Sequence, residues 1–170
     1  MTFVHKTAIV EDGAHLGAGV RVWHFAHVRS GATIGDDTQL GKSCYVDSTA
    51  VIGARCKIQN FVSVYAGVTL EDEVFVGPGV VFTNDLHPRA VGVWRIETTT
   101  IKRGASLGAN ATILCGIEVG EYAMIAAGSV VTKDVGPHEL VAGVPATRVG
   151  YVCICGRRVV APTGACQHAT

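Results

Sequence analysis

Large aliphatic or aromatic residues recur at every sixth position of this sequence. The run has fourteen members, pauses once, and then resumes for six more: Val4, Val10, Leu16, Val22, Val28, Ile34, Leu40, Val46, Ile52, Ile58, Val64, Leu70, Val76 and Phe82, followed by Ile101, Leu107, Ile113, Val119, Ile125 and Val131. A second series follows four residues behind the first and is mostly small: Ala8, Ala14, Val20, Ala26, Ala32, Thr38, Cys44, Ala50, Cys56 and Val62. Neither the helical period of 3.6 nor the strand period of 2 produces a step of six.

A step of six residues fits a short strand followed by a tight corner. Three such units close one triangular coil, so residues eighteen apart stack on one another. Glycine often follows the large residue, as at Leu16-Gly17 and Ile34-Gly35, where the backbone has to bend at low steric cost. The repeat therefore predicts an all-β protein, a parallel β-helix of about 6–7 triangular coils in which each coil is stable only within the stack.

The composition excludes several classes of partner. The chain has 170 residues, a formal net charge of zero and 16% charged residues, which argues against nucleic acid or an anionic membrane. No run approaches the roughly eighteen apolar residues of a spanning helix, and the first residues lack the apolar core of a signal peptide. We expect a cytoplasmic protein with a repeat domain over residues 1–150 and a partly mobile tail over residues 151–170.

The six cysteines fit a reducing compartment. Cys44 and Cys56 fall in the small series and are expected to behave as small apolar residues. Four potential zinc ligands occur in the tail, namely Cys153, Cys155, Cys166 and His168. Their Cys-x-Cys spacing is poorer than Cys-x-x-Cys and the tail is short, so we expect reduced thiols and no metal. A catalytic three-histidine zinc site is not expected either, because no histidine lies between His87 and His138.

The repeat is interrupted between Phe82 and Ile101, which are nineteen residues apart rather than a multiple of six. We expect one extruded loop here, residues 84–100, because this length does not fit a coil in register. The loop carries polar and basic residues close together: Asn84, Asp85, His87 and Arg89. Polar loops on a rigid scaffold often carry function, so we interpret it as a catalytic or lid element; the alternative is a plain solvent loop.

A second group of polar residues lies on outward positions of the earlier coils. Stacking by eighteen aligns His24 with Lys42, Asn60 and Pro78, and it aligns Arg29 with Asp47, Tyr65 and Thr83. The second line leads to the base of the interruption. We interpret these positions as a substrate groove; the alternative is a surface ion pair between Arg29 and Asp47, which would contribute little stability.

Several of these segments resemble those of nucleotide-sugar N-acetyltransferases. They are VWHFAH (22–27), KIQNFV (57–62), VFVGP (74–78) and FTND (82–85), followed by PR (88–89). They are similar above all to the UDP-2-acetamido-3-amino-2,3-dideoxyglucuronate N-acetyltransferases and to relatives that act on dTDP-3-amino-dideoxyhexoses. Residues 104–110, 126–135 and 143–146 resemble the acetyl-CoA-binding half of hexapeptide acyltransferases. The likeness covers residues 3–150.

This resemblance implies a left-handed β-helix and a homotrimer with active sites between neighbouring subunits. Acetyl-CoA would lie along the C-terminal coils, against Ala109, Ala127, Lys133, Pro145, Ala146 and Arg148, with Lys133 or Arg148 meeting its phosphates. The nucleotide sugar would lie around His24, Arg29, Asn60, Tyr65, Asp85 and Arg89. The implied reaction is N-acetylation of a UDP-linked 3-amino-2-acetamido uronic acid, for surface polysaccharide such as O-antigen lipopolysaccharide.

The loop sequence bears on how an amine would be activated. Many hexapeptide acyltransferases have a histidine base in this loop, whereas this chain has Asn84, which cannot accept the proton. We expect Asn84 to orient the amine while proximity supplies most of the acceleration. His87 is the alternative base, or else a solvated loop histidine. Two other functions stay open: O-acetylation of a sugar or serine hydroxyl with His87 as base, and a non-catalytic scaffold.

Overall fold

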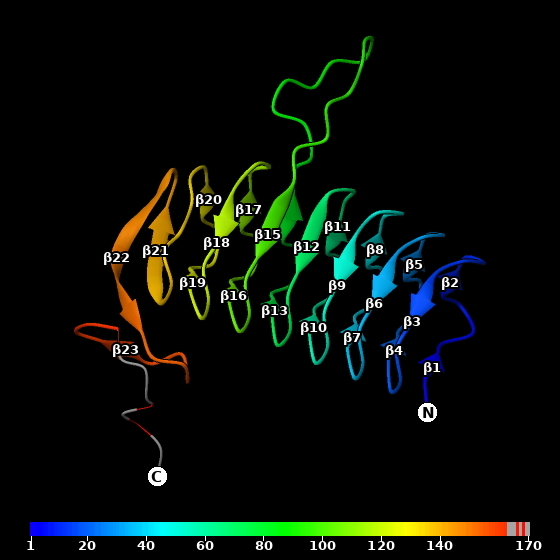
Figure 1. The fold of residues 1–170 in the computed structure, drawn as a ribbon, viewed down its shortest axis with the longest axis horizontal. Coiled ribbons are helices and arrows are strands. Elements are labelled where there is room, and N and C mark those ends of the chain that lie inside the picture. The colour runs from blue at the N-terminus through cyan, green and yellow to red at the C-terminus, as the bar shows by residue number, and fades with distance from the viewer. Residues whose placement is uncertain (163–165, 167, 169–170) are drawn as a thin grey trace.

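The computed structural model describes residues 1–162, 166 and 168, which form strands and turns with no helix. Most strands are two residues long, and they line three faces of a triangular prism, which we call faces A, B and C (Figure 1). Face A carries β1 (Phe3–Val4), β4 (Arg21–Val22), β7 (Gln39–Leu40), β10 (Lys57–Ile58), β13 (Phe75–Val76), β16 (Ser106–Leu107), β19 (Met124–Ile125) and β21 (Glu139–Gly143). Face B carries β2 (Ile9–Val10), β5 (His27–Val28), β8 (Tyr45–Val46), β11 (Ser63–Val64), β14 (Val81–Phe82), β17 (Thr112–Ile113) and β20 (Val130–Val131). Face C carries β3 (His15–Leu16), β6 (Thr33–Ile34), β9 (Val51–Ile52), β12 (Val68–Leu70), β15 (Thr99–Ile101) and β18 (Glu118–Val119).

The strands of each face pair in parallel with the predicted offset of eighteen residues. On face A, for example, Lys57 pairs with Gln39 before it and with Phe75 after it. Over the described part of the chain, face B has seven strands, β21 adds an eighth level to face A, and a bridge from Val119 to Val135 continues face C. The predicted parallel β-helix is therefore confirmed. Seven coils would give face A seven stacked strands, and β21 is one more. None of the described residues forms an apolar helix long enough to cross a bilayer.

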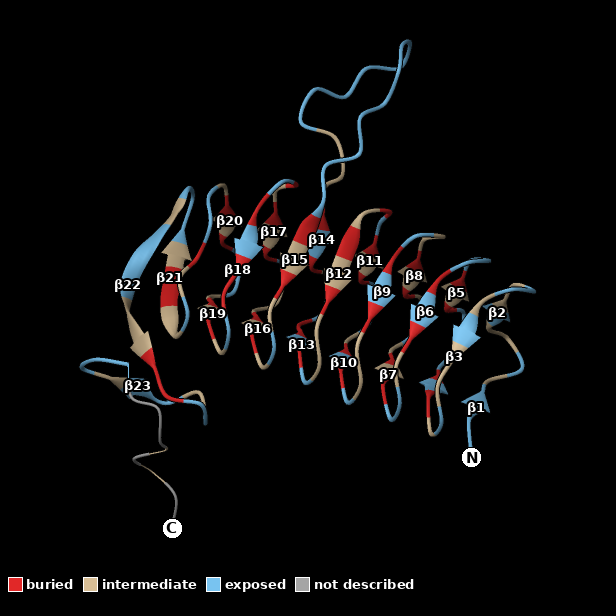
Figure 2. Ribbon diagram, viewed as in Figure 1, coloured by how far each residue is buried: buried red, intermediate tan, exposed pale blue. Residues whose placement is uncertain are grey.

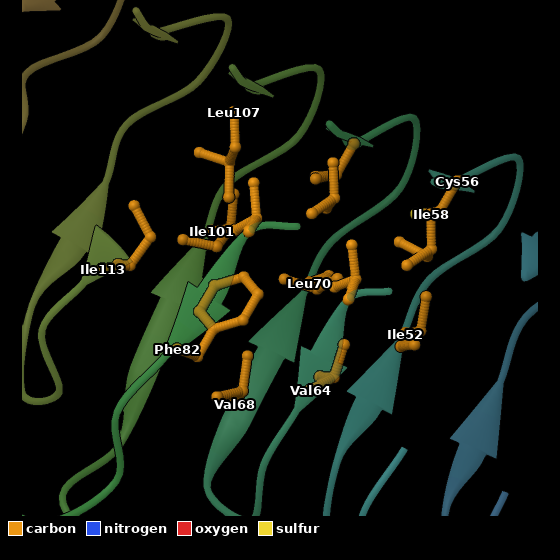
Figure 3. Close-up of a cluster of buried hydrophobic side chains, with 14 of the residues drawn as sticks. Ile52, Cys56, Ile58, Val64, Val68, Leu70, Phe82, Ile101, Leu107 and Ile113 are labelled. Carbon is orange, nitrogen blue, oxygen red and sulfur yellow. The ribbon is translucent and has the colours of Figure 1, made fainter. Parts of the chain in front are cut away.

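The interior of the prism is filled by the two six-residue series. From Val22 onward every member of the large series is at most 1% exposed, and side chains from the three faces meet at the centre (Figure 3). From Val20 onward the small series is buried between them, including Cys44 and Cys56, as expected. The first coil is less covered, with Val4 42% exposed, because no coil stacks beneath it (Figure 2).

The interruption is an insertion at the corner between faces B and C. β14 and β15 occupy consecutive faces, and both keep their stacking partners: Val81 pairs with Thr112 and Val68 pairs with Thr99. Each of these pairs is thirty-one residues apart, thirteen more than the usual eighteen. The extruded loop comprises residues 83–98 rather than the predicted 84–100, because Thr99 and Thr100 already belong to β15 (Figure 1).

The chain turns back on itself at the C-terminal end of the prism. β22 (Ala146–Val152) runs antiparallel to β21, and β23 (Arg158–Val159) runs antiparallel to β22. Within the described residues the predicted tail thus begins inside a strand, since β22 includes residues 151–152. The predicted boundary at residue 150 and the predicted mobility stay predictions, and residues 163–165, 167 and 169–170 of that tail lie outside the described residues.

Candidate functional site

The turns between faces A and B, which we call corner AB, carry one continuous line of predicted site residues. The line is His24, Lys42, Asn60, Pro78, Ala109 and Ala127, and the carbonyl of each of the first five accepts a backbone N–H from the next coil at 2.8–3.0 Å. It joins the predicted sugar-binding residues His24 and Asn60 to the predicted cofactor-binding residues Ala109 and Ala127. Stacking by eighteen alone does not show this continuity, because the insertion places Ala109 thirty-one residues beyond Pro78.

The N-terminal part of corner AB holds a hollow of about 330 Å³, lined by Trp23, His24, Gln39, Gly41, Lys42, Ile58, Gln59 and Asn60. Asn60 Oδ1 accepts the backbone N–H of Lys42 at 2.8 Å, which fixes the amide within the wall. The imidazole of His24 stacks on that of His5, with ring centroids 3.5 Å apart. Partial desolvation, aided by His24 and Lys6, lowers the pKa of His5 below its usual range. The hollow thus offers flat rings and amide groups.

The turns between faces B and C, which we call corner BC, carry the second predicted line. The Arg29 guanidinium donates to Asp47 Oδ1 at 3.2 Å, and its Nε lies 3.9 Å from Glu11 Oε1. Glu11 Oε1 also lies 2.7 Å from His27 Nε2. The line continues toward Tyr65, whose ring centroid is 5.9 Å from that of Tyr45 on face B. Arg29 is therefore already matched by two carboxylates, which reduces the positive charge that it offers to a substrate.

The extruded loop rises from corner BC and is braced by its own polar groups. The Asn84 carbonyl accepts the N–H of Glu97 at 3.0 Å, which closes the neck of the loop. Asp85 Oδ1 accepts the backbone N–H of His87 at 2.7 Å, and Asp85 Oδ2 accepts that of Arg95 at 3.2 Å. The predicted substrate ligand Asp85 thus positions the loop backbone.

A hollow of about 320 Å³ lies within the loop, lined by Asp85, Leu86, His87, Val93, Arg95 and Glu97. His87 is exposed on this hollow, while Asn84 is half-buried at the neck. Arg89 is exposed and donates to the Pro88 carbonyl at 2.8 Å. Arg95 and Glu97 were missed by the sequence reasoning; their place in the same polar insertion is the signal that could have found them.

Four of the six predicted cofactor residues share a hollow of about 300 Å³ at the C-terminal end of the prism. Lys133, Pro145, Ala146 and Arg148 all line it. The Arg148 guanidinium already has two partners, because it donates to Glu139 Oε1 at 3.0 Å and lies over the Tyr151 ring. Lys133 is exposed. The hollow combines two cationic side chains with a partly apolar wall, and the carboxylates of Asp134 and Glu139 also line it. Because Glu139 pairs with Arg148, Lys133 is the cation in this hollow that is better placed to meet a phosphate. Ala109 and Ala127 lie outside it, on corner AB.

Within one chain, the predicted site residues form three groups rather than one, and the C-terminal hollow of Lys133, Pro145, Ala146 and Arg148 is one of them. Corner AB holds His24, Asn60, Ala109 and Ala127, whereas corner BC and its loop hold Arg29, Tyr65, Asn84 and His87. Face B separates the two corners, with the outward side chains of His27, Tyr45, Ser63 and Val81 between them. A single copy of the chain therefore does not bring the loop to the line of corner AB.

Comparison with known proteins gives consistent matches to one family. The model described as bacterial transferase hexapeptide (six repeats) matches residues 49–84 and 98–133, and that of the hexapeptide repeat of succinyl-transferase matches residues 31–66. The chain is 48% identical over 159 residues to the dTDP-3-amino-3,6-dideoxy-alpha-D-galactopyranose 3-N-acetyltransferase of Aneurinibacillus thermoaerophilus, covering 90% of this chain and 80% of that protein. It is also 47% identical to serine acetyltransferase 4 of Arabidopsis thaliana, but over only 41% of this chain and 17% of that protein.

Solved structures share the fold. A hexapeptide-repeat acetyltransferase from Vibrio cholerae, complexed with acetyl coenzyme A, aligns with a TM-score of 0.63 at 26% identity, covering 71% of this chain and 70% of that one. The acetyltransferase domain of PglB from Neisseria gonorrhoeae aligns with a TM-score of 0.59 at 20% identity, covering 88% and 58% of the two chains, and shows the fold alone.

Proposed function

The chain belongs to the hexapeptide-repeat acetyltransferases, whose repeat implies a left-handed parallel β-helix, and on this premise we propose that it acetylates the amino group of a nucleotide-linked amino sugar with acetyl-CoA. The observation that carries the proposal is the 48% identity, over nearly the whole chain, to an N-acetyltransferase of a dTDP-3-amino sugar. The acetyl-CoA complex of the V. cholerae structure supports the acetyl donor. The reaction would take place in the cytoplasm and supply surface polysaccharide synthesis.

The active site forms between subunits of a homotrimer. This part of the proposal is supported by the separation of the two corners within one chain and by the surface of the loop. Val91 and Val93 are 90% and 91% exposed, and Trp94 and Ile96 are also exposed. Apolar side chains gathered on a projecting loop indicate a surface that a partner covers. A neighbouring subunit would cover them if the loop from corner BC lies against that subunit's corner AB.

This arrangement would assemble all the predicted groups. Acetyl-CoA would run along corner AB past Ala127 and Ala109, with its nucleotide end in the hollow of Lys133, Pro145 and Arg148. The sugar nucleotide would occupy the hollow of His24 and Asn60. Its amine would lie where the neighbouring loop presents Asn84.

The chemical step needs little help from a base. The lone pair of the neutral amine attacks the thioester carbonyl, the C–S bond breaks as the tetrahedral intermediate collapses, and the nitrogen loses a proton while coenzyme A leaves as the thiol. A fraction of such amines is neutral near pH 7, so positioning by Asn84 and a backbone N–H at the oxyanion would supply most of the acceleration.

The sugar itself is the finer part of the proposal. The relative acts on a dTDP-linked 3-amino-3,6-dideoxyhexose, which has no carboxylate. The UDP-linked 3-amino-2-acetamido uronic acid would need a cation at its carboxylate. Arg29 already contacts Asp47 and lies near Glu11, whereas Arg89 of the loop and Lys42, which lines the hollow of His24 and Asn60, could serve. We favour a neutral sugar because the relative acts on one, and keep the uronic acid as an outcome of the test.

The test is a screen of dTDP- and UDP-linked 3-amino and 4-amino sugars, including the uronic acid, with acetyl-CoA and detection of thiol release. If none of the amino sugars is acetylated and calorimetry detects no binding of CoA, the acetyltransferase proposal is refuted in favour of a scaffold. Acetylation of hydroxyl acceptors alone would instead establish an O-acetyltransferase.

Two loop variants separate the roles of Asn84 and His87. We expect Asn84→Ala to lower kcat/KM by a factor of roughly 100, as loss of a positioned hydrogen-bonding group does, and His87→Ala to lower it less than about tenfold. The reverse order would make His87 the general base. Leu86→Ala is the matched control, since it changes an exposed side chain of the same loop.

A further inference from the structure

The C-terminal end of the chain contains four metal-binding side chains that the fold brings together. They are Cys153, Cys155, Cys166 and His168, and their ligand atoms all lie within 4.8 Å of one another. Cys153 and Cys155 belong to the turn between β22 and β23, whereas Cys166 and His168 come from the chain after β23. None of them belongs to the predicted site of acetyl transfer. The spacing in the sequence suggested a tail without metal, but this convergence was not visible there.

The distances fit a tetrahedral zinc ion. With Zn–S bonds of about 2.3 Å and Zn–N bonds of about 2.05 Å, tetrahedral angles place two sulfurs about 3.8 Å apart and a sulfur about 3.6 Å from a nitrogen. Cys155 Sγ lies 3.5 Å from His168 Nδ1, and the 4.8 Å limit leaves room for the remaining pairs. Three sulfurs and one imidazole nitrogen match the Cys₃His ligand set of structural zinc sites.

The turn that carries the first two thiols is held by its own backbone hydrogen bonds. Cys153 N–H donates to the Arg157 carbonyl, and Gly156 N–H donates to the Cys153 carbonyl, both at 2.8 Å. Gly156 has a φ of +82°, which suits glycine. A Cβ at this position would lie 3.2 Å from Met124 Cε of face A. The turn is thus tight and packed against the prism. It holds both thiols in position before an ion binds, which lowers the entropic cost of binding.

The base of the hairpin is anchored to the last corner of the prism. Val152 N–H donates to the His138 carbonyl at 2.8 Å, and His138 Nδ1 lies 3.1 Å from the Val152 carbonyl. The His138 ring stacks on Tyr122, with centroids 5.5 Å apart. Two of the four ligands are therefore fixed relative to the β-helix, and an ion would attach Cys166 and His168 to that frame.

We propose that Cys153, Cys155, Cys166 and His168 bind one structural Zn²⁺ ion. Four protein ligands complete a tetrahedral shell and leave no position for water or substrate, so the ion holds structure and takes no part in acetyl transfer. It fastens the chain after β23 to the β22–β23 turn. β22 begins at Ala146, which lines the hollow of Lys133 and Arg148, so the ion braces the strand that borders the proposed nucleotide end of the cofactor site.

The test measures metal content of the full-length protein, produced with zinc in the medium and purified with a reductant and without chelator. Wild type should retain about one zinc per chain, as a closed thiolate site does. Cys155→Ala and His168→Ala should each retain less than about a fifth of that amount. Cys115→Ala, which removes a buried thiol outside the cluster, is the matched control and should keep its zinc. Circular dichroism checks that all variants fold.

Cobalt substitution reports the ligand set directly. The Co²⁺ form of wild type should show the visible ligand-field bands of tetrahedral cobalt and a near-ultraviolet thiolate charge-transfer band, and Cys155→Ala should reduce the latter. Absence of zinc and of these bands in the folded wild type would overturn the proposal, as would ligand variants that retain full zinc. A disulfide between two of the tail cysteines in the reduced-purified protein would overturn it as well. None of these readouts depends on acetyltransferase activity.

Discussion

Thr38 and Thr99 allow one substitution to be tested in two environments that differ mainly in hydrogen bonding. Thr38 belongs to the inward small series, Thr99 holds the equivalent place two residues before Ile101, and both side chains are fully buried. Thr38 Oγ1 donates to the Gly53 carbonyl at 2.7 Å and accepts the Cys56 N–H at 3.0 Å. Thr99 Oγ1 has no hydrogen-bond partner among the residues that the structure describes. Replacing threonine by valine therefore removes two hydrogen bonds at position 38 and an unsatisfied hydroxyl at position 99.

The expected changes in the free energy of unfolding have opposite signs. Thr38→Val leaves the buried Cys56 N–H and the part-buried Gly53 carbonyl without this partner. At about 1–3 kcal/mol for the buried group, and less for the part-buried one, we expect a loss of about 2–4 kcal/mol. Thr99→Val removes a buried polar group, and Val68 already fills the stacked position on the preceding coil. We therefore expect a gain of about 1 kcal/mol. Since Tm moves by about 2–4 °C per kcal/mol in a chain of this size, the two variants should differ by roughly 10 °C.

The measurement is urea-induced unfolding followed by circular dichroism, at one protein concentration because association adds to the apparent stability. Thermal scans of the same samples give the difference in Tm. A loss of more than about 1 kcal/mol in Thr99→Val, or the same loss in both variants, would show that hydrogen bonding does not distinguish the two sites.

Three further outcomes follow from burial and charge. Burial raises the pKa of the Cys44 thiol to about 11 and raises that of Cys56, so both should be silent toward a disulfide reagent at pH 8 in the folded protein and react only after denaturation; reaction in the folded state would contradict this. Val93→Asp should shift the sedimentation coefficient from trimer toward monomer, whereas Val160→Asp, at a residue 99% exposed, should not; an unchanged trimer in the first variant would place the loop outside the interface. Hydrogen bonds from the Ser30 N–H and the His27 side chain lower the pKa of Glu11 below 4.5. The stability advantage of wild type over Glu11→Gln should therefore be full above pH 4.5 and decline as the pH falls further. An advantage that grows on acidification would show that these bonds do not favour the charged carboxylate.

The proposed zinc site illustrates where sequence spacing fails as a guide. Cys153 and Cys155 are separated by one residue, and this Cys-x-Cys spacing is a poorer zinc motif than Cys-x-x-Cys. The sequence therefore led us to expect a tail without metal. In the structure, the hairpin of β22 and β23 and the chain after it bring Cys166 and His168 back to the same turn. Ligand geometry depends on this return, which is a tertiary property.

The candidate active site was predicted in part, and the limit has the same origin. The composition of the loop indicated Asn84 and His87, and the step of eighteen placed Arg29 next to Asp47, which the structure confirms. The sequence did not show that His24 and Ala127 lie on one line of corner AB. The loop adds thirteen residues to one coil, but the strands above it still stack on those below. Strands stack by pairing in space, and an insertion leaves this pairing intact. The insertion does change the number of residues between stacked positions, so the step of eighteen no longer identifies them.

A period of six with one large and one small inward residue can be buried only by a three-sided coil, so the scaffold and the place of its interruption could be predicted from the residues alone. The structure was needed to show that face B separates corner AB from corner BC. It was also needed to show which buried threonine is hydrogen-bonded and that four metal-binding side chains meet at the C-terminal end. Inward positions follow a local repeat, whereas these contacts join segments whose separation along the chain follows no such rule.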